Sequence, residues 1–478
     1  MEKTTEKIVK EAIQWVEENK GSKVESKGTY TSPRISSEVM DCSVPLTFDH
    51  YSKCSMSCIY CFSFFFKSNN AMLAEGSSRR VPFILRSADM CKMVKTMCGE
   101  NISDERSRAL YNHFYSKKFV LHWGGLADPF CNHEAINKEG LTFLNALGEM
   151  NYPTLFSFKG STINKDPYVK LFDKYSKQKN FAFQTSIITF DDKRAKEIEI
   201  GVPPPSMRIK TMEMLYQMGY WTILRLRPFI IGITDETIDE LLDASLKAGI
   251  KGISMEFFAL DARANVHMLS RYKWLAKQMG IKNLMAYFAK LSPLERGTYR
   301  RLNWKIKEHW VKKVFLFCQK NKLVFACSDP DFKELCSSGS CCGMPDHYPP
   351  NPLLENWSHD QLAYHLKEAR KHYHRTGERV ILTFDGIYSD KATYLDDLAF
   401  HDDHVAVIGQ KQYIRNATTV RHVILRHWEN VNSSANPRNY FDRKLEVHGK
   451  DSKGHTTYIY LPRPYEEEWK KEGIDLCY

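Results

Sequence analysis

The sequence predicts an α/β protein built around parallel βα units of the open or complete barrel type. The chain has 478 residues, more than one ordinary domain and enough to bury a large core. Between residues 44 and 260, short β-rich runs alternate with charged stretches of helical character, which is typical of parallel βα units. Active sites in such folds lie at the carboxyl ends of the strands. The six expected strands are Val44–Phe48, Phe119–Trp123, Thr154–Phe158, Ala182–Ile188, Trp221–Pro228 and Gly252–Phe257.

The flanking regions differ in character from this central part. Residues 4–19 place apolar side chains at helical spacing, and a linker rich in Gly, Ser and Lys follows. Helical segments dominate from 261 to 321, and the Pro-rich stretch 349–352 marks a boundary. The predicted domains are an N-terminal helix and linker (1–43), the barrel (44–260), a basic helical region with a Cys-rich loop (261–350) and a small α/β module (351–478). In that module we expect a helix near 358–373 and strands at Val380–Phe384, His404–Ile408 and Thr456–Tyr460.

Composition favours a folded cytoplasmic protein. Apolar residues make up 43% of the chain and aromatic residues 13%, which argues against disorder. No stretch supplies the run of about 20 uncharged apolar residues that a membrane helix needs, so no membrane association is expected. The first thirty residues lack the apolar core of a secretory signal. In the cytoplasm the thirteen cysteines stay reduced, so clustered cysteines are expected to be metal ligands.

One cysteine group has a spacing suited to an iron–sulfur cluster. The segment HYSKCSMSCIYCF places Cys54, Cys58 and Cys61 at the spacing C-x3-C-x2-C, on a loop after the first predicted strand. Three thiolate ligands on a [4Fe–4S] cluster leave one iron open, and an open iron can bind the amino and carboxylate groups of S-adenosylmethionine (SAM). The alternative is a zinc site, or chance clustering of cysteines in an apolar loop.

Three further motifs follow in a fixed order. HWGGLADPF comes after the second predicted strand and contains Gly124, Gly125 and Asp128. FSFKGS comes after the third and contains Lys159, and the fourth strand contains Ser186. Together with the cysteine triad, these segments resemble the radical SAM family, in the branch that contains spore photoproduct lyase.

The longest similarity to that family runs from residue 183 to residue 257. It includes IEIGVPPPSMR, which is similar to the family's Glu-Pro-x-x-Pro-x-x-x-x-Arg stretch, although Ile200 replaces the proline next to the glutamate. The whole resemblance covers residues 44–260, slightly under half the chain. The matching residues of this part are Glu199, Pro203, Arg208, Pro228 and Gly232.

The resemblance implies a radical SAM partial (βα)6-type barrel, with a [4Fe–4S] cluster and SAM as cofactors and an external electron donor such as flavodoxin or ferredoxin. It implies that Tyr60 lies beside the adenine and that Lys159 pairs with the carboxylate of SAM. Two residues have simpler alternatives, Arg208 as a surface cation of a helix and Ser186 as an ordinary strand residue. The expected SAM-binding residues are Tyr60, Gly124, Gly125, Asp128, Lys159, Ser186 and Arg208.

The sequence departs from spore photoproduct lyase where the lyase relays hydrogen. The lyase has a hydrogen-donating cysteine three residues before the Asp of its Asp-Pro pair, and this chain has Gly125 there. The lyase has a tyrosine directly after the third cluster cysteine, and this chain has Phe62. Dimer cleavage by the lyase route is therefore not expected, unless Cys131 serves as the hydrogen donor. An incidental buried cysteine is the alternative for Cys131.

A second cysteine group follows near residue 330. The run ACSDPDFKELCSSGSCCGM places Cys327, Cys336, Cys341 and Cys342 at the spacing C-x8-C-x4-C-C. Four sulfurs within sixteen residues favour a second Fe–S cluster, and structural zinc is the main competitor. Adjacent cysteines suit a larger cluster better than one small tetrahedral ion.

The net charge of +11 is concentrated in one stretch. Residues 271–322 contain fourteen Lys or Arg against Glu295 and Glu308. Such cations contact phosphates and interleaved aromatic rings stack on bases, so a nucleic-acid partner is expected. The alternative is a set of amphipathic helices with buried aromatics and a solvated basic face. The aromatic residues concerned are Tyr272, Trp274, Tyr287, Phe288, Tyr299, Trp304 and Trp310.

Together these patterns predict a radical SAM enzyme that generates a 5′-deoxyadenosyl radical for hydrogen abstraction. The expected reaction modifies or rearranges a nucleobase of the thymine type in DNA. One alternative is a radical SAM maturase acting on a peptide or small metabolite. Another is a nucleic-acid-binding protein in which the cysteines hold structural metal and no catalysis occurs.

Overall fold

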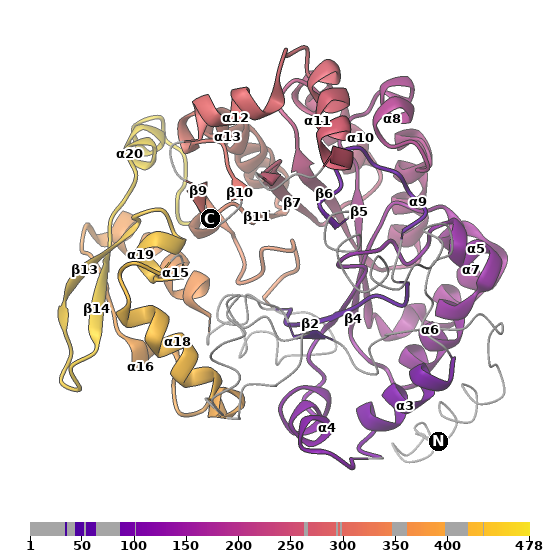
Figure 1. Ribbon diagram of the computed structural model, residues 1–478, viewed down its shortest axis with the longest axis horizontal. Coiled ribbons are helices and arrows are strands. Elements are labelled where there is room, and N and C mark those ends of the chain that lie inside the picture. The colour runs from indigo at the N-terminus through magenta and orange to yellow at the C-terminus, as the bar shows by residue number, and fades with distance from the viewer. Residues whose placement is uncertain are drawn as a thin grey trace. The chain divides into compact units, whose positions relative to one another are not determined.

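The computed structural model describes eleven stretches of the chain, drawn as ribbons in Figure 1. The chain divides into two compact units. Among the described residues, the first unit consists mainly of Leu46–Lys251 and Phe257–Asn303, and the second of Gly252–Glu256 and Trp304–Tyr478. The described stretches are residues 34–35, 44–51, 54–63, 87–100, 102–261, 266–292, 295–296, 299–346, 361–396, 419–433 and 435–478.

Parallel strands form the centre of the first unit. Each of these strands pairs in parallel with the next one along the chain, as expected for successive βα units. The residues of β4 and β5 are buried throughout, which explains why their sequences are apolar and aromatic rather than alternating. The strands are β2 (Leu46–Phe48), β3 (Leu121–Trp123), β4 (Thr154–Phe158), β5 (Phe181–Ser186) and β6 (Trp221–Phe229).

Helices connect these strands and lie along their outer side in Figure 1. Local capping fixes where two of them begin. The Asp191 carboxylate accepts from the backbone N–H of Lys193 and Arg194 and starts α8. Proline at the first position starts α9, where the Ser206 hydroxyl donates to Asp192 at 2.6 Å. The helices are α3 (Ser87–Met97), α4 (Glu105–Leu110), α5 (Asn132–Asn137), α6 (Glu139–Glu149), α7 (Asp166–Tyr175), α8 (Asp192–Ile198), α9 (Pro205–Gln217), α10 (Ile238–Lys247), α11 (Val266–Gln278) and α12 (Leu284–Leu291).

Aromatic rings fill the core between these strands and helices. Phe156 and Phe183 from neighbouring strands stack with centroids 5.2 Å apart, and Phe172 of α7 meets Phe183 edge-on at 5.1 Å. Such paired rings add to the stability that their burial supplies. A small antiparallel ribbon completes the unit and consists of β8 (Leu260–Asp261), β10 (Tyr299–Arg300) and β9 (Glu295–Arg296).

The second unit contains two parallel strands and a separate antiparallel sheet. β7 (Gly252–Phe257) pairs in parallel with β11 (Val324–Cys327), and α13 (Trp304–Asn321) precedes β11. The antiparallel sheet has the order β12 (Ile381–Leu382), β14 (Thr456–Tyr460), β13 (Leu445–Lys450). Its helices are α15 (Leu362–Thr376), α16 (Phe384–Ile387), α18 (Val420–Glu429), α19 (Pro437–Tyr440) and α20 (Pro464–Lys471).

Buried ion pairs are part of the core of the second unit. Lys307 on α13 is fully buried, and its ammonium group donates to Asp329 at 2.8 Å and also to Asp331. Lys444 is likewise buried and pairs with Glu334, which accepts a further bond from a tyrosine hydroxyl. Because an unpaired buried charge is costly, each of these side chains depends on its partner to stay inside the unit.

The predicted α/β class is confirmed, with corrections to single elements. β4, β7 and β14 have the expected bounds, and α15 covers the described part of the helix expected near 358–373. A seventh parallel strand, β11, and the strand β13 were not expected. The strand expected at Val380–Phe384 is wrong at its end, because Thr383 caps α16 by accepting from the Gly386 N–H. The helix at 4–19, the stretch 349–352 and the strand at His404–Ile408 lie outside the described residues. Within the described parts of the chain, every helix is too short or too polar to cross a membrane.

Candidate functional site

The three cysteines lie on the loop that follows β2. The Cys58 thiol is buried, and those of Cys54 and Cys61 are partly buried. The loop is tied to the end of α8 by a bond from the Ile59 N–H to the Ile198 carbonyl at 3.0 Å. The Cys61 N–H donates to the Cys58 carbonyl at 3.2 Å, so these two cysteines stand at the two ends of one turn.

The donor set of this loop is chemically suited to an Fe–S cluster. Three thiols within eight residues supply the ligands that iron in such clusters uses. Burial raises the pKa of Cys58 to about 12, against the charge of Lys159, whose Nζ lies 3.7 Å from the Cys58 Sγ. A buried thiol of this kind becomes a thiolate when a metal replaces its proton. The described residues contain no group of three His, Cys, Asp or Glu side chains already arranged around a metal position.

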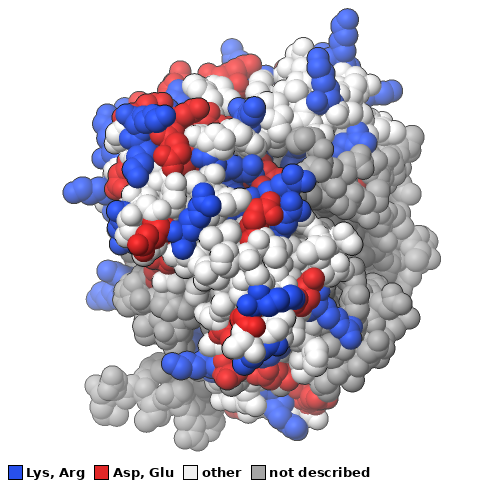
Figure 2. Space-filling model, turned by 90° about the vertical axis from the view of Figure 1, so that its left-hand side faces the viewer, with Lys and Arg blue, Asp and Glu red and all other residues white. Residues whose placement is uncertain are grey.

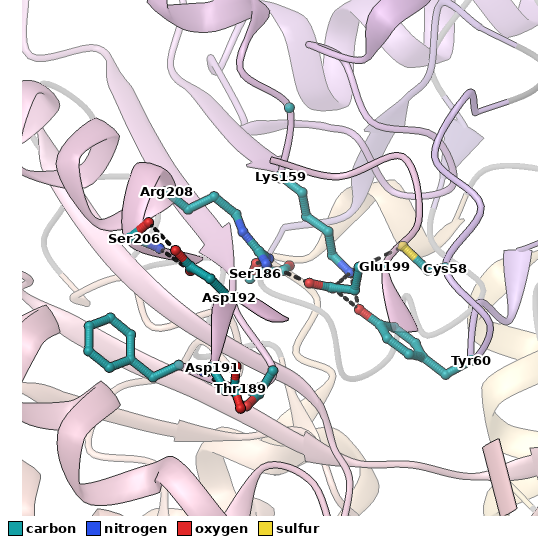
Figure 3. Close-up of polar contacts among 12 residues, drawn as sticks. Cys58, Tyr60, Lys159, Ser186, Thr189, Asp191, Asp192, Glu199, Ser206 and Arg208 are labelled. Atoms are coloured by element: carbon teal, nitrogen blue, oxygen red, sulfur yellow. Dashed lines mark hydrogen bonds and ion pairs between the residues drawn. The ribbon is translucent and has the colours of Figure 1, made fainter. Parts of the chain in front are cut away.

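A buried carboxylate next to Cys58 contacts three of the seven predicted SAM-binding residues (Figure 3). Glu199 accepts from Lys159 Nζ at 2.7 Å and from Arg208 Nη2 at 2.5 Å, and the Tyr60 hydroxyl also donates to it. Burial opposes the ionisation of Glu199, but the cations of Arg208 and Lys159 outweigh it and hold its pKa at about 2. The Lys159 ammonium group also lies 4.6 Å from the centre of the Tyr60 ring. The set therefore comprises two cations and one anion beside the cysteine loop.

Arg208 is a buried member of this set. It comes from the first turns of α9, and 1% of its surface is exposed. Its Nη1 donates to the Ser186 carbonyl at 2.5 Å, while the Ser186 hydroxyl lies 3.3 Å from Arg225 Nη1. The surface-cation alternative for Arg208 is therefore wrong, and Ser186 supplies its backbone carbonyl to the set. The buried Nε of Arg208 has no partner among the described residues, which leaves donor capacity for a bound polar group.

Asp128 organises the backbone around Lys159. Its carboxylate accepts from the N–H groups of Phe130 at 2.8 Å, Lys159 at 2.5 Å and Gly160 at 3.1 Å. Burial raises the pKa of Asp128 to about 7, against the lowering effect of these three donors. Asp128 thus joins the loop after β3 to the loop after β4 and aims Lys159 at the cysteine loop.

The two glycines of the HWGGLADPF motif lie at the start of the loop after β3. Gly124 has φ of +102°, and a Cβ there would lie 2.3 Å from the Ser157 carbonyl oxygen. Its N–H donates to the Phe48 carbonyl at 3.0 Å. Gly124 is therefore required by the close approach of neighbouring strands, and Gly125 follows it as a partly buried residue.

Cys131 is a fourth thiol at this loop. It is fully buried at the N-terminus of α5, and its side chain is hydrogen-bonded to the thiol of Cys54 and to Ser55. The hydrogen bond with Cys131, together with burial, raises the pKa of Cys54. Cys131 thus lies next to a predicted cluster ligand rather than at a distance from the site.

A buried hydrogen-bond cluster behind this loop was not expected from the sequence. The Glu134 carboxylate of α5 lies 3.0 Å from His50 Nε2 and accepts from the hydroxyls of Tyr51 and Tyr168 at 2.5 Å each. Trp123 Nε1 donates to His50 Nδ1 at 3.0 Å, which leaves the proton of His50 on Nε2, facing Glu134. His50 and Tyr51 stand shortly before the cysteine triad in the sequence. No sequence pattern links them to Glu134, so this cluster could not be predicted.

Arg271 also reaches the cysteine loop, and the sequence assigned it to the basic stretch. Its Nη1 donates to the Cys58 carbonyl at 2.8 Å from helix α11. The two residues are separated by 213 positions. No local sequence pattern predicts a contact between residues that are so far apart in the chain.

The second cysteine group lies in the second unit. Cys327 ends β11, and its N–H donates to the Cys336 Sγ at 3.2 Å. Burial raises the pKa of Cys336 to about 12. The Ser254 hydroxyl donates to the Cys341 carbonyl at 2.9 Å, and Cys342 follows as a buried residue. Two of these cysteines line a small pocket, whose lining residues are Lys333, Cys336, Ser338, Gly339, Cys341 and Ala363.

Some side chains of the basic stretch 271–322 are buried inside the protein, and others are exposed at its surface. Tyr272 and Phe288 are buried in the core, whereas Trp274 is 50% exposed. Lys307 is enclosed in ion pairs, and Lys312 pairs with Glu472 at 2.6 Å. Figure 2 shows a different face, the left-hand side of Figure 1 where α20, β13 and β14 lie, and there Lys and Arg are interspersed with Asp and Glu.

No protein-family model matches the sequence, and no curated protein matches it. Solved structures do match. Streptococcus suis SuiB bound to precursor peptide SuiA is 15% identical, with a TM-score of 0.37 over 60% of this chain and 49% of that one. The match thus spans about half the length of SuiB. A spore photoproduct lyase mutant is 12% identical, with a TM-score of 0.45 over 63% of this chain and 80% of the lyase. A lyase mutant with bound AdoMet and dinucleoside spore photoproduct is 12% identical, with a TM-score of 0.43 over 62% and 80% of the two chains.

Proposed function

We propose that the protein is a radical SAM enzyme whose [4Fe–4S] cluster is held by Cys54, Cys58 and Cys61. The observation that supports this most is the position of Lys159, which follows β4 and places its ammonium group 3.7 Å from the Cys58 thiol. Cluster and SAM together supply a 5′-deoxyadenosyl radical that abstracts hydrogen from an unreactive carbon. The electron comes from an external donor such as flavodoxin or ferredoxin, and we expect the enzyme to act in the cytoplasm.

In this proposal the residues around Glu199 bind the amino-acid part of SAM. Lys159 and Arg208 provide two positive charges and Glu199 one negative charge, so one positive charge is left to attract the carboxylate of SAM. Tyr60, hydrogen-bonded to Glu199, presents its ring beside the same group and is placed to contact the adenine. Gly124, Gly125, Asp128 and Ser186 shape the backbone that surrounds these side chains.

Anaerobic reconstitution with iron and sulfide tests the cofactor assignment. The wild-type protein should bind at least about four irons and, after reduction, convert SAM to 5′-deoxyadenosine. Cys58→Ala should lose the iron of this cluster and all SAM cleavage. Cys98→Ser is the matched control, because Cys98 lies in the same unit and its thiol donates to the Met150 sulfur. Zinc in place of iron, with no SAM cleavage, would instead favour a metal-stabilised nucleic-acid-binding protein.

We propose a second Fe–S cluster at Cys327, Cys336, Cys341 and Cys342, with structural zinc as the competing occupant. The proximity of these cysteines supports a group bound at this place, because the Cys327 N–H donates to the Cys336 Sγ at 3.2 Å and Cys336 and Cys341 line the same small pocket. The wild-type protein should then bind about eight irons, and Cys336→Ala should retain about four together with SAM cleavage. One zinc and about four irons per chain would instead identify a zinc site.

For the substrate we propose a thymine-type nucleobase in DNA, modified or rearranged rather than cleaved from a dimer. The exposed Trp274 and the exposed cations Lys273 and Lys277 on the same helix support a contact with nucleic acid. Lys273→Glu with Lys277→Glu should weaken binding to thymine-containing DNA at least tenfold and reduce its salt dependence. Lys193→Glu with Lys196→Glu on α8, which makes the same change in net charge, should have a smaller effect.

A peptide or small metabolite is the second candidate substrate, because auxiliary clusters are common in enzymes that mature peptides. The four cysteines of the second unit favour it. DNA binding that is unchanged by the Lys273→Glu and Lys277→Glu pair, or equally weakened by the control pair, would remove the support for DNA. Comparing modified nucleosides in cells with and without the gene would then decide whether DNA is the substrate.

A further inference from the structure

Arg271 holds the turn that joins two of the cysteines. The Cys58 carbonyl accepts two hydrogen bonds, one from the Cys61 N–H at 3.2 Å and one from Arg271 Nη1 at 2.8 Å. The first bond closes the turn that sets the spacing of the two thiols. The second fixes the carbonyl of that turn from outside, so the guanidinium group of Arg271 keeps the turn in place.

Helix α11 is packed firmly enough to keep Arg271 in this position. Leu275 and Met268 of α11 are buried in the same apolar cluster as Ile59 of the cysteine loop. At the end of the helix, Arg194 Nη2 donates to the Gln278 carbonyl at 2.6 Å. The helix is therefore anchored through its apolar face and at its C-terminal end.

Arg271 also brings a permanent positive charge to the loop. A guanidinium group stays protonated throughout the physiological range, and the bond from Arg271 Nη1 to the Cys58 carbonyl places this charge at the turn. On the other side of Cys58, Lys159 and Arg208 share the single negative charge of Glu199, so a second net positive charge lies near this thiol. Arg271 differs from these two cations because it is bonded to the backbone of the turn between Cys58 and Cys61 and is not paired with Glu199.

We propose that Arg271 is a positioning residue that holds the Cys58–Cys61 turn and raises the reduction potential of the cluster bound there. This inference rests on the proposed function. Adding one electron makes the cluster and its thiolates more negative, so a fixed cation nearby stabilises the reduced form. The hydrogen bond to the ligand backbone keeps that cation at a constant place.

This role is tested by potentiometric titration of the reconstituted protein without SAM, with the reduced cluster detected by electron paramagnetic resonance. Arg271→Gln keeps a hydrogen-bond donor but removes the charge, and it should lower the ratio of reduced to oxidised cluster about tenfold at a fixed potential. For a one-electron couple this corresponds to about 59 mV. Arg271→Lys keeps the charge and should recover most of the wild-type potential. Lys174→Gln, which removes a cation of the first unit that pairs with Glu149 at 2.5 Å and holds neither α11 nor the cysteine loop, should leave the potential unchanged.

The possible outcomes separate this inference from the proposed function. If the wild-type protein binds a cluster and Arg271→Gln has the same reduction potential, the role of Arg271 is overturned and the enzyme assignment remains intact. A wild-type protein that binds no iron overturns the enzyme assignment itself. If Arg271→Gln loses iron while Lys174→Gln and Arg271→Lys keep all of it, the charge of Arg271 is needed to hold the turn.

Discussion

Replacing Glu199 by glutamine removes a buried negative charge that faces two cations. The pKa of Glu199 is held at about 2, compared with an ordinary value of 4.5. At 1.36 kcal/mol for each pKa unit, this interval corresponds to about 3 kcal/mol of folding stability. The cost of breaking a buried ion pair is typically about 3–5 kcal/mol, which agrees with this value. We therefore expect Glu199→Gln to destabilise the first unit by about 3 kcal/mol.

The pH dependence of this contribution follows from the lowered pKa. A carboxylate whose folded pKa lies below its unfolded value stabilises the fold fully above pH 4.5 and loses that contribution as the pH falls toward 2. The difference in stability between the wild-type protein and Glu199→Gln should therefore be constant near neutral pH and shrink below pH 4.5. Arginine and lysine side chains as a class lose their charge only far above this range, so the two cations that face Glu199 do not alter the sign.

Urea unfolding measures this effect in the first unit alone if it is monitored by the hydrogen exchange of peptides from residues 154–225. For an m-value of about 3 kcal/mol per molar urea, the midpoint should fall by about 1 M. Glu197→Gln is the control, because this exposed carboxylate accepts a bond from Gln278 and should change stability by less than about 0.5 kcal/mol. Equal midpoints for Glu199→Gln and Glu197→Gln would refute the argument that the charges around Glu199 stabilise the unit.

Two further substitutions test the packing of each unit. Lys307→Met leaves the carboxylates of Asp329 and Asp331 buried without their cation, so the second unit should lose about 3–5 kcal/mol in urea unfolding. An unchanged midpoint would show that these carboxylates do not need the ion pair. Gly160→Ala would place a Cβ 2.0 Å from the Phe130 carbonyl oxygen, and the resulting overpacking should cost about 1–3 kcal/mol. A melting temperature equal to that of the wild-type protein would contradict this contact.

Local patterns predicted the strands well where burial alone determines them. The run Thr154–Phe158 is buried on both faces and has the bounds expected from its sequence. β11 was missed because its four residues become a strand by pairing with β7, and that partner lies some seventy positions earlier in the chain. The Cys-rich loop was expected from Cys327 onward and the residues just before it were given no strand, because composition does not reveal pairing over such a distance.

The site shows the same division between local and distant information. The cysteine spacing and the position of Lys159 after a strand are local, and the structure places Lys159 beside Cys58. The local sequence does not predict in which direction a charged side chain on a helix will point. Arg208 was open to interpretation as a surface cation, and Arg271 was counted with the basic stretch, because a helix sequence does not state which neighbours its charged face will meet.

The buried ion pairs of the second unit have a consequence for its behaviour on heating. The hydration of charged groups becomes less favourable as temperature rises, so the cost of keeping the charges of Lys307 and Lys444 inside the protein falls. Hydrophobic stabilisation for a given buried area does not increase in the same way. The contribution of these ion pairs therefore grows with temperature, and this unit should resist heat better than its unfolding in urea at 25 °C would indicate.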